Sequence, residues 1–461
     1  MSLTLALLLA YSVLLIGVGL WVGRRVRATR DFFVAGRGLG AGLLFSTFLA
    51  ANIGAGSTVG ATALAYRDGL SAWWWNGSAG IGSLVLAFWI GPRIWREAAR
   101  HDDHTLGDFL ERHYGRAMRG LVALVIWIGT YYILAGQLLG IAAVLHVAGN
   151  VPVAAGIVAG ALVTTLYFVA GGLVSSAWVN RVQLAVIVAG FAVAVPAAVT
   201  AAGGWPPVLE RGGVGLDLFG TGAADSGWRN LILLGPAFIV SPGLLQKAYG
   251  ARDAATVTRG IAWNGAVLML FACAPAIIGT AARLLYPDLE QPDTALATVL
   301  TGTLPIGVGA LALAAVFSAE VSSADAVLFM LSTSASRDLY KGFLRRDASD
   351  ASILRVARAT AVLAGAVGIG VALISGTVLG ALRVFYAIMV VTLFVPVLGA
   401  LFVPGAGRTA GLASVVCGVT TLLVVQVMTG GAGFGLLSPT LAGVIAAGIA
   451  FGAARARSRN H

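Results

Sequence analysis

Long apolar runs limit what this chain can fold into. Its 461 residues contain repeated apolar stretches of roughly 20 residues, the length that an α-helix needs to cross the hydrocarbon core of a bilayer. Charged residues make up 11% of the chain, whereas a soluble domain has about a quarter. We therefore predict an all-α integral membrane protein that forms one membrane domain over residues 1–461.

About 13 segments are long and apolar enough to span a membrane. The polar stretch 101–115 between two of them is predicted to form a short surface helix with Thr105 as its N-cap. We divide the domain into a first helix and loop (1–40), a first repeat (41–201), a second repeat (229–403) and C-terminal helices (404–461). The predicted spans are 2–23, 41–65, 70–94, 119–146, 151–171, 178–201, 230–249, 257–281, 304–336, 354–374, 378–403, 409–428 and 437–454.

The basic residues are distributed unevenly between the two sides of these spans. About 25 of the 30 Lys and Arg residues fall in the loops on one side, and short loops rich in Lys and Arg remain in the cytoplasm. An odd number of spans then places the N-terminus outside and the Arg-rich C-terminus inside the plasma (inner) membrane. The net charge of +11 is thus explained by topology, and we expect no nucleic-acid partner.

Two of the spans are interrupted by residues that weaken a helix. LAANIGAGS, residues 49–57, places Asn and Gly inside the second span, and Ser241, Pro242 and Gly243 interrupt the seventh. Each break opens a unit of about five spans, and the odd offset gives the two units opposite orientations. Single kinks at Gly and Pro are common in membrane helices, but matched breaks in inverted units are typical of the central site of a secondary transporter.

The first break is predicted to expose backbone oxygens that lipid cannot satisfy. Sodium prefers oxygen ligands, and the carbonyls of Ala50 and Ile53 are the obvious donors at the break. In the ninth span, Ala319, Ser322 and Ser323 are spaced i, i+3 and i+4, so they share one helix face. Together these residues can supply an oxygen site for Na⁺, although a Ser-Ser pair alone is also typical of hydrogen bonds between membrane helices.

Six segments of the chain resemble the sodium:solute symporter family. They are DFFVAGRGLG, AANI, TLGDFLERHYG, GGLVSSAWVNRVQ, SPGLLQKAYGARD, and AEVSSADAVL followed by RDLYKGF, and they extend over nearly the whole chain in the family's order. The resemblance implies a LeuT-like 5+5 inverted repeat, in which the first helix of each repeat is discontinuous. It also implies that Na⁺ is co-transported and is held by Ala50, Ile53, Ala319, Ser322 and Ser323.

Two positions depart from the pattern of this family. Members often carry a Thr-Asp pair where this chain has Val179 and Asn180, and in some relatives that Asp is linked to an additional sodium site. We therefore expect one Na⁺ per transport cycle. The sugar-transporting branch has an acidic pocket residue where this chain has Asn76, so we do not expect a hexose substrate.

The predicted substrate-facing residues are small or polar and lie at the breaks or in neighbouring spans. Trp73 to Trp75 form either an aromatic wall of the pocket or a belt at the membrane interface. Gln137 suits either the pocket or a hydrogen bond between helices. Because the N-terminal ends of half-helices favour anionic groups, we favour an amino acid or a small carboxylate as substrate. The predicted residues are Asn52, Gly56, Ser57, Asn76, Gln137 and Ser241.

The ninth span also carries two acids, Glu320 and Asp325, and an acid inside the membrane is a functional candidate by default. Each lies about 60° around the helix from a serine of the predicted Na⁺ face, so we assign neither as a ligand. Our hypothesis is Na⁺-coupled import of a small organic solute by alternating access. The alternatives are proton coupling through one of these acids, and a membrane sensor, for which the short tail offers no kinase module. We find no arrangement of residues that supports an enzyme.

Overall fold

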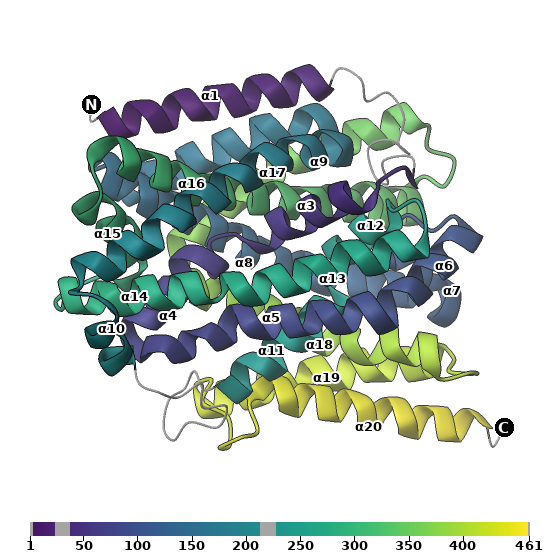
Figure 1. The fold of residues 1–461 in the computed structure, drawn as a ribbon. Helices are drawn as coiled ribbons and strands as arrows, with labels where there is room; N and C mark the ends of the chain where they lie inside the picture. Colours follow the sequence, from purple (N-terminus) through teal and green to yellow (C-terminus); the bar gives the residue numbers. More distant parts are fainter. Residues whose placement is uncertain (1–2, 24–36, 213–226, 460–461) are drawn as a thin grey trace.

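The computed structural model describes residues 3–23, 37–212 and 227–459, and most of its long helices run along a common direction (Figure 1). Over these ranges the regular structure is helical, with two isolated β-bridges and no strand. The predicted all-α class is confirmed for this part of the chain. Segments 24–36 and 213–226 lie outside the described residues, as do most of the basic residues predicted for the first cytoplasmic loop.

In the N-terminal half, the helices follow the predicted spans. The second and third predicted spans are divided into shorter helices, and α9 covers the fifth and sixth as one element. The helices are α1 (Leu3–Gly23), α3 (Ala41–Asn52), η2 (Gly56–Gly60), α4 (Ala61–Asp68), η3 (Gly69–Ala72), α5 (Trp73–Val85), η4 (Leu86–Ile90), α6 (Gly91–His101), α7 (Leu106–Tyr114), α8 (Arg116–Gly149), α9 (Val153–Ala201) and α10 (Trp205–Gly212).

In the C-terminal half, the helices also follow the predicted spans. The seventh predicted span is divided at Ser241, and the ninth continues from α16 into η6. The helices are α11 (Gly227–Val240), α12 (Pro242–Tyr249), α13 (Ala254–Phe271), α14 (Cys273–Leu285), η5 (Pro292–Thr294), α15 (Ala295–Thr303), α16 (Ile306–Thr333), η6 (Ser334–Leu344), α17 (Asp350–Ile374), α18 (Val378–Phe402), α19 (Arg408–Thr429) and α20 (Pro439–Arg459).

Length and composition make this a multi-pass membrane protein. Nine helices of the described residues are long and apolar enough to cross a bilayer, or up to ten if the bent segment that begins with α3 is counted as one span. The number of 13 spans, the inverted relation of the two repeats and the divisions at residues 40, 201, 229 and 403 stay predictions.

Large apolar side chains cover much of the outside of the bundle. Leu270, Ile374 and Val427 are 73%, 80% and 81% exposed. In water such a surface would favour aggregation. Lipid tails are as apolar as a leucine side chain, so these residues suit a lipid-facing surface. The core, by contrast, holds buried ionisable side chains such as Lys247 and Glu320.

The two ends of the bundle are built from different helices. Figure 1 places α6, α7 and the C-terminal end of α20 at one end, and α10, α15 and the start of α1 at the other. α6 and α7 belong to the predicted cytoplasmic loops. The first and last described helices therefore begin and end on opposite sides, as an odd number of spans requires. Which of the two ends faces the cytoplasm stays a prediction.

Ion pairs connect three helices at the end that holds α7. Thr105 caps α7 in a capping box with Asp108, as predicted, and its hydroxyl donates to Asp338 of η6 over 2.6 Å. Arg119 of α8 lies 3.0 Å from both Asp108 and Asp338, and 2.7 Å from Glu111. Arg119 and Asp338 are buried, so this pairing offsets the cost of removing their charges from water.

His104 precedes this cap and is also buried. Its Nδ1 lies 2.7 Å from the carbonyl oxygen of Asp102. Burial and the positive charge of Arg337 lower the pKa of His104 to about 4. Burial opposes ionisation of Asp108, but the charge of Arg119 and two backbone N–H groups outweigh it and hold the pKa of that carboxyl below its usual value.

We predict that acid destabilises the protein through His104. The unfolded side chain takes up a proton near pH 6.5 and the folded one only near pH 4, so the unfolded state binds more protons between these values. The free energy of unfolding then falls as the pH is lowered, by up to about 1.4 kcal/mol per pH unit. Thermal unfolding in detergent should show a smaller acid-induced drop in Tm for His104→Gln than for the unmodified protein. Equal drops would contradict this assignment.

Candidate functional site

α3 unwinds where the sequence predicts its break. The helix ends at Asn52, the chain resumes as η2 at Gly56, and the segment bends by 62°. The backbone amides of Ser57 and Thr58 in η2 both donate to the carbonyl of Gly54. Among the described residues, no backbone amide donates to the carbonyls of residues 50–53. The break therefore presents carbonyl oxygens without amide partners inside the bundle.

Two hydroxyl groups of α16 contact these carbonyls. Ser322 Oγ lies 2.8 Å from the carbonyl oxygen of Ala50 and 3.0 Å from that of Ala319. Ser323 Oγ lies 3.3 Å from the oxygen of Ala50 and 3.1 Å from that of Ala51. We call these two hydroxyls and three carbonyls the serine–carbonyl group. The carbonyl of Ala319 lies inside α16 and already has a helical amide partner, so the two hydroxyl protons are available to the carbonyls of Ala50 and Ala51, which no backbone amide of the described residues satisfies. Five oxygens therefore meet at this contact.

The serine–carbonyl group brings together four of the five predicted Na⁺ ligands. Ile53, the fifth, is buried in the unwound segment, and no hydrogen bond to its carbonyl occurs within the described residues. Ala51 also contributes a carbonyl to the group, although the sequence does not predict it. Its place inside a helical run does not single it out. The four residues that meet are Ala50, Ala319, Ser322 and Ser323.

Gly54 lets the break approach α16 closely. A Cβ atom there would lie 2.2 Å from Ser323 Oγ and 2.6 Å from Gln137 Oε1. Gln137 comes from α8 and accepts a hydrogen bond from the amide of Ala55 over 2.8 Å. Of the two roles considered for Gln137, the structure therefore gives it the hydrogen bond between helices.

Glu320 contacts the other side of the break. Its side chain is fully buried, and its Oε1 accepts a hydrogen bond from Thr58 Oγ1 over 2.8 Å. Its Oε2 has no hydrogen-bond partner within the described residues and lies near Gly140 of α8. Glu320 thus contacts the start of η2, not the carbonyls at the end of α3. Asp325 is also buried and interacts electrostatically with Lys247 of α12.

Side-chain hydrogen bonds hold the remaining residues of the break. Asn52 Nδ2 donates to Asn264 of α13 over 3.1 Å. Ser57 Oγ donates to the carbonyl of Asn52 over 2.6 Å, and Asn76 of α5 donates to the carbonyl of Ser57 over 2.9 Å. Three of the predicted substrate-facing residues are therefore linked by hydrogen bonds around the unwound segment.

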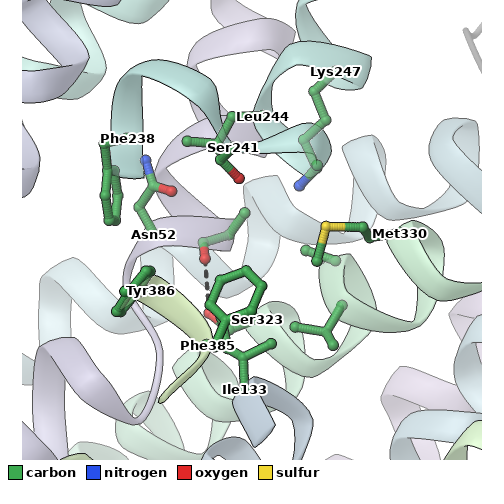
Figure 2. A pocket seen from close by; sticks show the side chains of 14 residues that line it. Asn52, Ile133, Phe238, Ser241, Leu244, Lys247, Ser323, Met330, Phe385 and Tyr386 are labelled. Atoms are coloured by element: carbon green, nitrogen blue, oxygen red, sulfur yellow. Dashed lines mark hydrogen bonds between the residues drawn. The ribbon is translucent and has the colours of Figure 1, made fainter. Parts of the chain in front are cut away.

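The second predicted break lies at Ser241, the single residue between α11 and α12. A cavity of about 50 Å³ lies between the two breaks (Figure 2). This volume is much smaller than the roughly 300–1,000 Å³ of a typical small-molecule site. Its polar lining side chains are those of Asn52, Ser241, Lys247 and Ser323, and its larger apolar ones are Phe238, Met330, Phe385 and Tyr386.

The cavity is lined by only two of the six predicted substrate-facing residues, Asn52 and Ser241. Trp75 is buried behind the lining residue Tyr386, with the ring centroids 6.2 Å apart in an edge-on arrangement. This Trp therefore supports the cavity wall and is not part of an interfacial belt. The predicted residues that begin η2 or hydrogen-bond to the residues around the break, without lining the cavity, are Gly56, Ser57, Asn76 and Gln137.

Sequence reasoning missed most of the cavity wall. Phe238, Phe385 and Tyr386 lie in largely apolar stretches of their helices, and no spacing separates them from lipid-facing residues. Lys247 did carry a signal, because it is a charged residue shortly after a helix break. From its charge we expect Lys247, near the end of the predicted span 230–249, on the basic cytoplasmic side with the loop that follows, whereas its side chain is 1% exposed and lines the cavity.

The chain matches known transporters over most of its length. A family model described as the sodium:solute symporter family matches residues 32–418. The chain is 26% identical to the human high affinity choline transporter 1, covering 89% of this chain and 75% of that protein. It is 24% identical to the sodium/glucose cotransporter of Vibrio parahaemolyticus, covering 77% of this chain and 72% of that protein. It is also 26% identical to the Escherichia coli sodium/pantothenate symporter, covering 72% and 71%.

The fold matches as well. The solved structure of a Na⁺-coupled sialic acid symporter, in a substrate-bound outward-open state, has a TM-score of 0.81 at 16% identity and covers 98% of both chains. At this identity the likeness shows the fold alone, which is that of the LeuT-like transporters. The match over residues 32–418 confirms the resemblance seen in the six motifs, and with it Na⁺ as the co-transported ion. The chain belongs to the sodium:solute symporter family.

Proposed function

We propose that this protein is a symporter that uses Na⁺ to import a small organic solute, either an amino acid or a small carboxylate, by alternating access. The observation that carries the proposal is the serine–carbonyl group, in which two hydroxyl and three carbonyl oxygens meet inside the bundle. We place the protein in the plasma (inner) membrane, with its N-terminus outside and its basic loops in the cytoplasm.

We propose that Na⁺ binds at this group. A cation can replace the hydroxyl protons as the partner of these carbonyls, because hydroxyl and carbonyl oxygens can both turn lone pairs toward it. Hard cations prefer oxygen ligands, and the C-terminal end of α3 contributes partial negative charge. The proposed ligands are four residues of this group, Ala50, Ala319, Ser322 and Ser323, together with Ile53 from the unwound segment beside it.

Ser323 connects the proposed Na⁺ site to the cavity. Its hydroxyl is part of the serine–carbonyl group, and the residue also lines the cavity. Asn52 follows the carbonyls of the group along the chain and lines the cavity too. An ion that orders this segment would also order the cavity wall. By linkage, a solute in the cavity would then raise the affinity for the ion by the same factor.

The start of α12 supports an anionic group on the solute. Gly243 and Leu244 belong to the first turn of this helix and line the cavity. Amides in a first turn have no partner within the helix and carry partial positive charge. The remaining wall is largely aromatic and aliphatic, which suits a small organic body.

The driving force differs between the two solute classes. One charge that crosses about 100 mV releases about 2.3 kcal/mol, and a tenfold Na⁺ gradient adds about 1.4 kcal/mol. A zwitterionic amino acid that moves with one Na⁺ uses both terms, which together support accumulation by a few hundredfold. A monocarboxylate cancels the charge of the Na⁺, so only the concentration term, about tenfold, remains.

A proton-coupled transporter is the second candidate, because Glu320 is buried and its Oε2 has no hydrogen-bond partner in the described part of the chain. Uptake of radiolabelled amino acids and monocarboxylates into proteoliposomes separates the two. A Na⁺ gradient at equal pH should drive uptake, and a pH gradient without Na⁺ should not. The reverse result would replace Na⁺ by a proton as the coupling ion.

We predict that Na⁺ stabilises the protein through the two serines. NaCl should raise the Tm of the purified protein above its value in KCl, and the double variant Ser322→Ala/Ser323→Ala should lose this rise because its Na⁺ affinity falls by about tenfold or more. Ser332→Ala is the matched control, since the Oγ of this buried serine of α16 has no hydrogen-bond partner within the described residues. A full Na⁺ effect in the double variant would rule out this site.

We also predict that Gly54→Ala abolishes the Na⁺-dependent rise in Tm. The added Cβ would lie 2.2 Å from Ser323 Oγ and must displace it. Overpacking of this kind costs roughly 1–3 kcal/mol, so the Tm without Na⁺ should fall as well. Gly370→Ala in α17 is the control, because a Cβ there meets nothing within 4 Å. An unchanged Na⁺ response in Gly54→Ala would mean that Ser323 is not a ligand.

A further inference from the structure

We propose that the ammonium group of Lys247 binds an anionic group of the solute, most simply a carboxylate, inside the cavity between the two breaks. This inference rests on the proposed function, because it takes the cavity to be the solute site. It adds a specific residue and a required charge to that site. The supporting observations are the position of Lys247, its hydrogen bonding and the other side chains that line the cavity.

Lys247 projects from α12 into the interior of the bundle. Figure 2 shows its Nζ directed toward the space between Ser241 and Met330, both of which line the cavity. The side chain is 1% exposed, so its charge is removed from water. A charge in such a position must be compensated by nearby groups, since burying an ion without compensation costs several kcal/mol.

The compensation is incomplete in this structure. An ammonium group has three N–H bonds. Within the described residues, one partner is present at hydrogen-bond distance, the carbonyl oxygen of Thr47 in α3, at 3.0 Å. Asp325 of α16 adds a favourable electrostatic interaction. Lys247 therefore retains donor capacity at the wall of a cavity, where a ligand can use it.

The rest of the lining identifies the kind of ligand. Among the described residues that line the cavity, Lys247 is a cation and none is a carboxylate. Asn52 and Ser241 add neutral polar groups, and Phe238 and Tyr386 provide apolar surface. A solute with a compact organic body and one negatively charged group matches this arrangement. A cationic solute without such a group would leave the free N–H groups of Lys247 without an acceptor.

A purely structural role is the competing explanation. Through its contacts with Thr47 and Asp325, Lys247 connects α12 to α3 and α16. In that case, its removal would act by taking away the favourable interaction with Asp325. Replacing both residues by neutral ones, Lys247→Met/Asp325→Asn, would then restore binding. If Lys247 contacts the solute, the double variant remains defective.

The experiment compares carboxylates with their own amides by thermal unfolding of the full-length purified protein in NaCl. The probes are acetate, propionate, pyruvate, alanine and proline, each beside the amide that has nearly the same shape but lacks the negative group. We expect at least one carboxylate, and not its amide, to raise the Tm of the unmodified protein. In Lys247→Met and in the double variant, the affinity for that compound should fall by about tenfold or more.

Na⁺ alone is the control that separates the two proposals. If Lys247→Met keeps the rise in Tm caused by NaCl over KCl, the variant is folded and its Na⁺ site is intact. Lys341→Met, at the α7 end of the bundle, should keep the responses to both Na⁺ and carboxylate. The inference is overturned if no carboxylate is preferred to its amide, or if the double variant regains carboxylate binding. If NaCl does not raise the Tm of the unmodified protein above its value in KCl, the proposed function is contradicted instead.

Discussion

The contact between the unwound end of α3 and the serine face of α16 is the interaction on which the site depends. A helix that stops inside a membrane leaves carbonyl oxygens that neither lipid nor the helix itself can satisfy. Ser322 and Ser323 supply hydroxyl groups to those of Ala50 and Ala51, and leaving one such group unsatisfied costs about 1–3 kcal/mol. This contact holds the break in place, and its hydroxyl and carbonyl oxygens can also turn lone pairs toward a cation.

The remaining polar groups of the core surround the same break. Gln137 of α8, Asn76 of α5 and Asn264 of α13 each hydrogen-bond to the unwound segment or to the residues beside it. Each comes from a different helix, so the segment is held from several directions although it lacks helical hydrogen bonds. Irregular backbone is tolerated at membrane depth only where it is enclosed by protein in this way. Lipid around the protein thus explains both features: it suits an apolar exterior, and it requires polar groups to find their partners in the core.

Charged groups are used differently in two places. At the α7 end of the bundle, Arg119 is surrounded by acids from α7 and η6, and its charge is fully matched by its neighbours. In the cavity, Lys247 has one hydrogen bond and one favourable electrostatic neighbour. The first arrangement stabilises contacts between helices. The second leaves donor capacity that a ligand can use, and it lies beside Ser323, which also belongs to the serine–carbonyl group.

The sequence by itself determined the all-α class, the approximate ends of most helices, both breaks, and four of the residues that meet at the serine–carbonyl group. These features depend on local properties: apolar length, the weakness of helices at Gly and Pro, and helical spacing that places Ser322 and Ser323 on one face. The N-cap at Thr105 was predictable for the same reason.

Only the tertiary structure decided which side chains face the cavity. Asn76 and Gln137 satisfy the polar criteria that Asn52 and Ser241 satisfy, yet they support the break from behind. Their direction depends on how α5 and α8 pack, and no local pattern encodes that. Lys247 is the clearest case, because α12 turns it into the bundle after the second break, whereas an unbroken helix would carry it on toward the basic loop that follows.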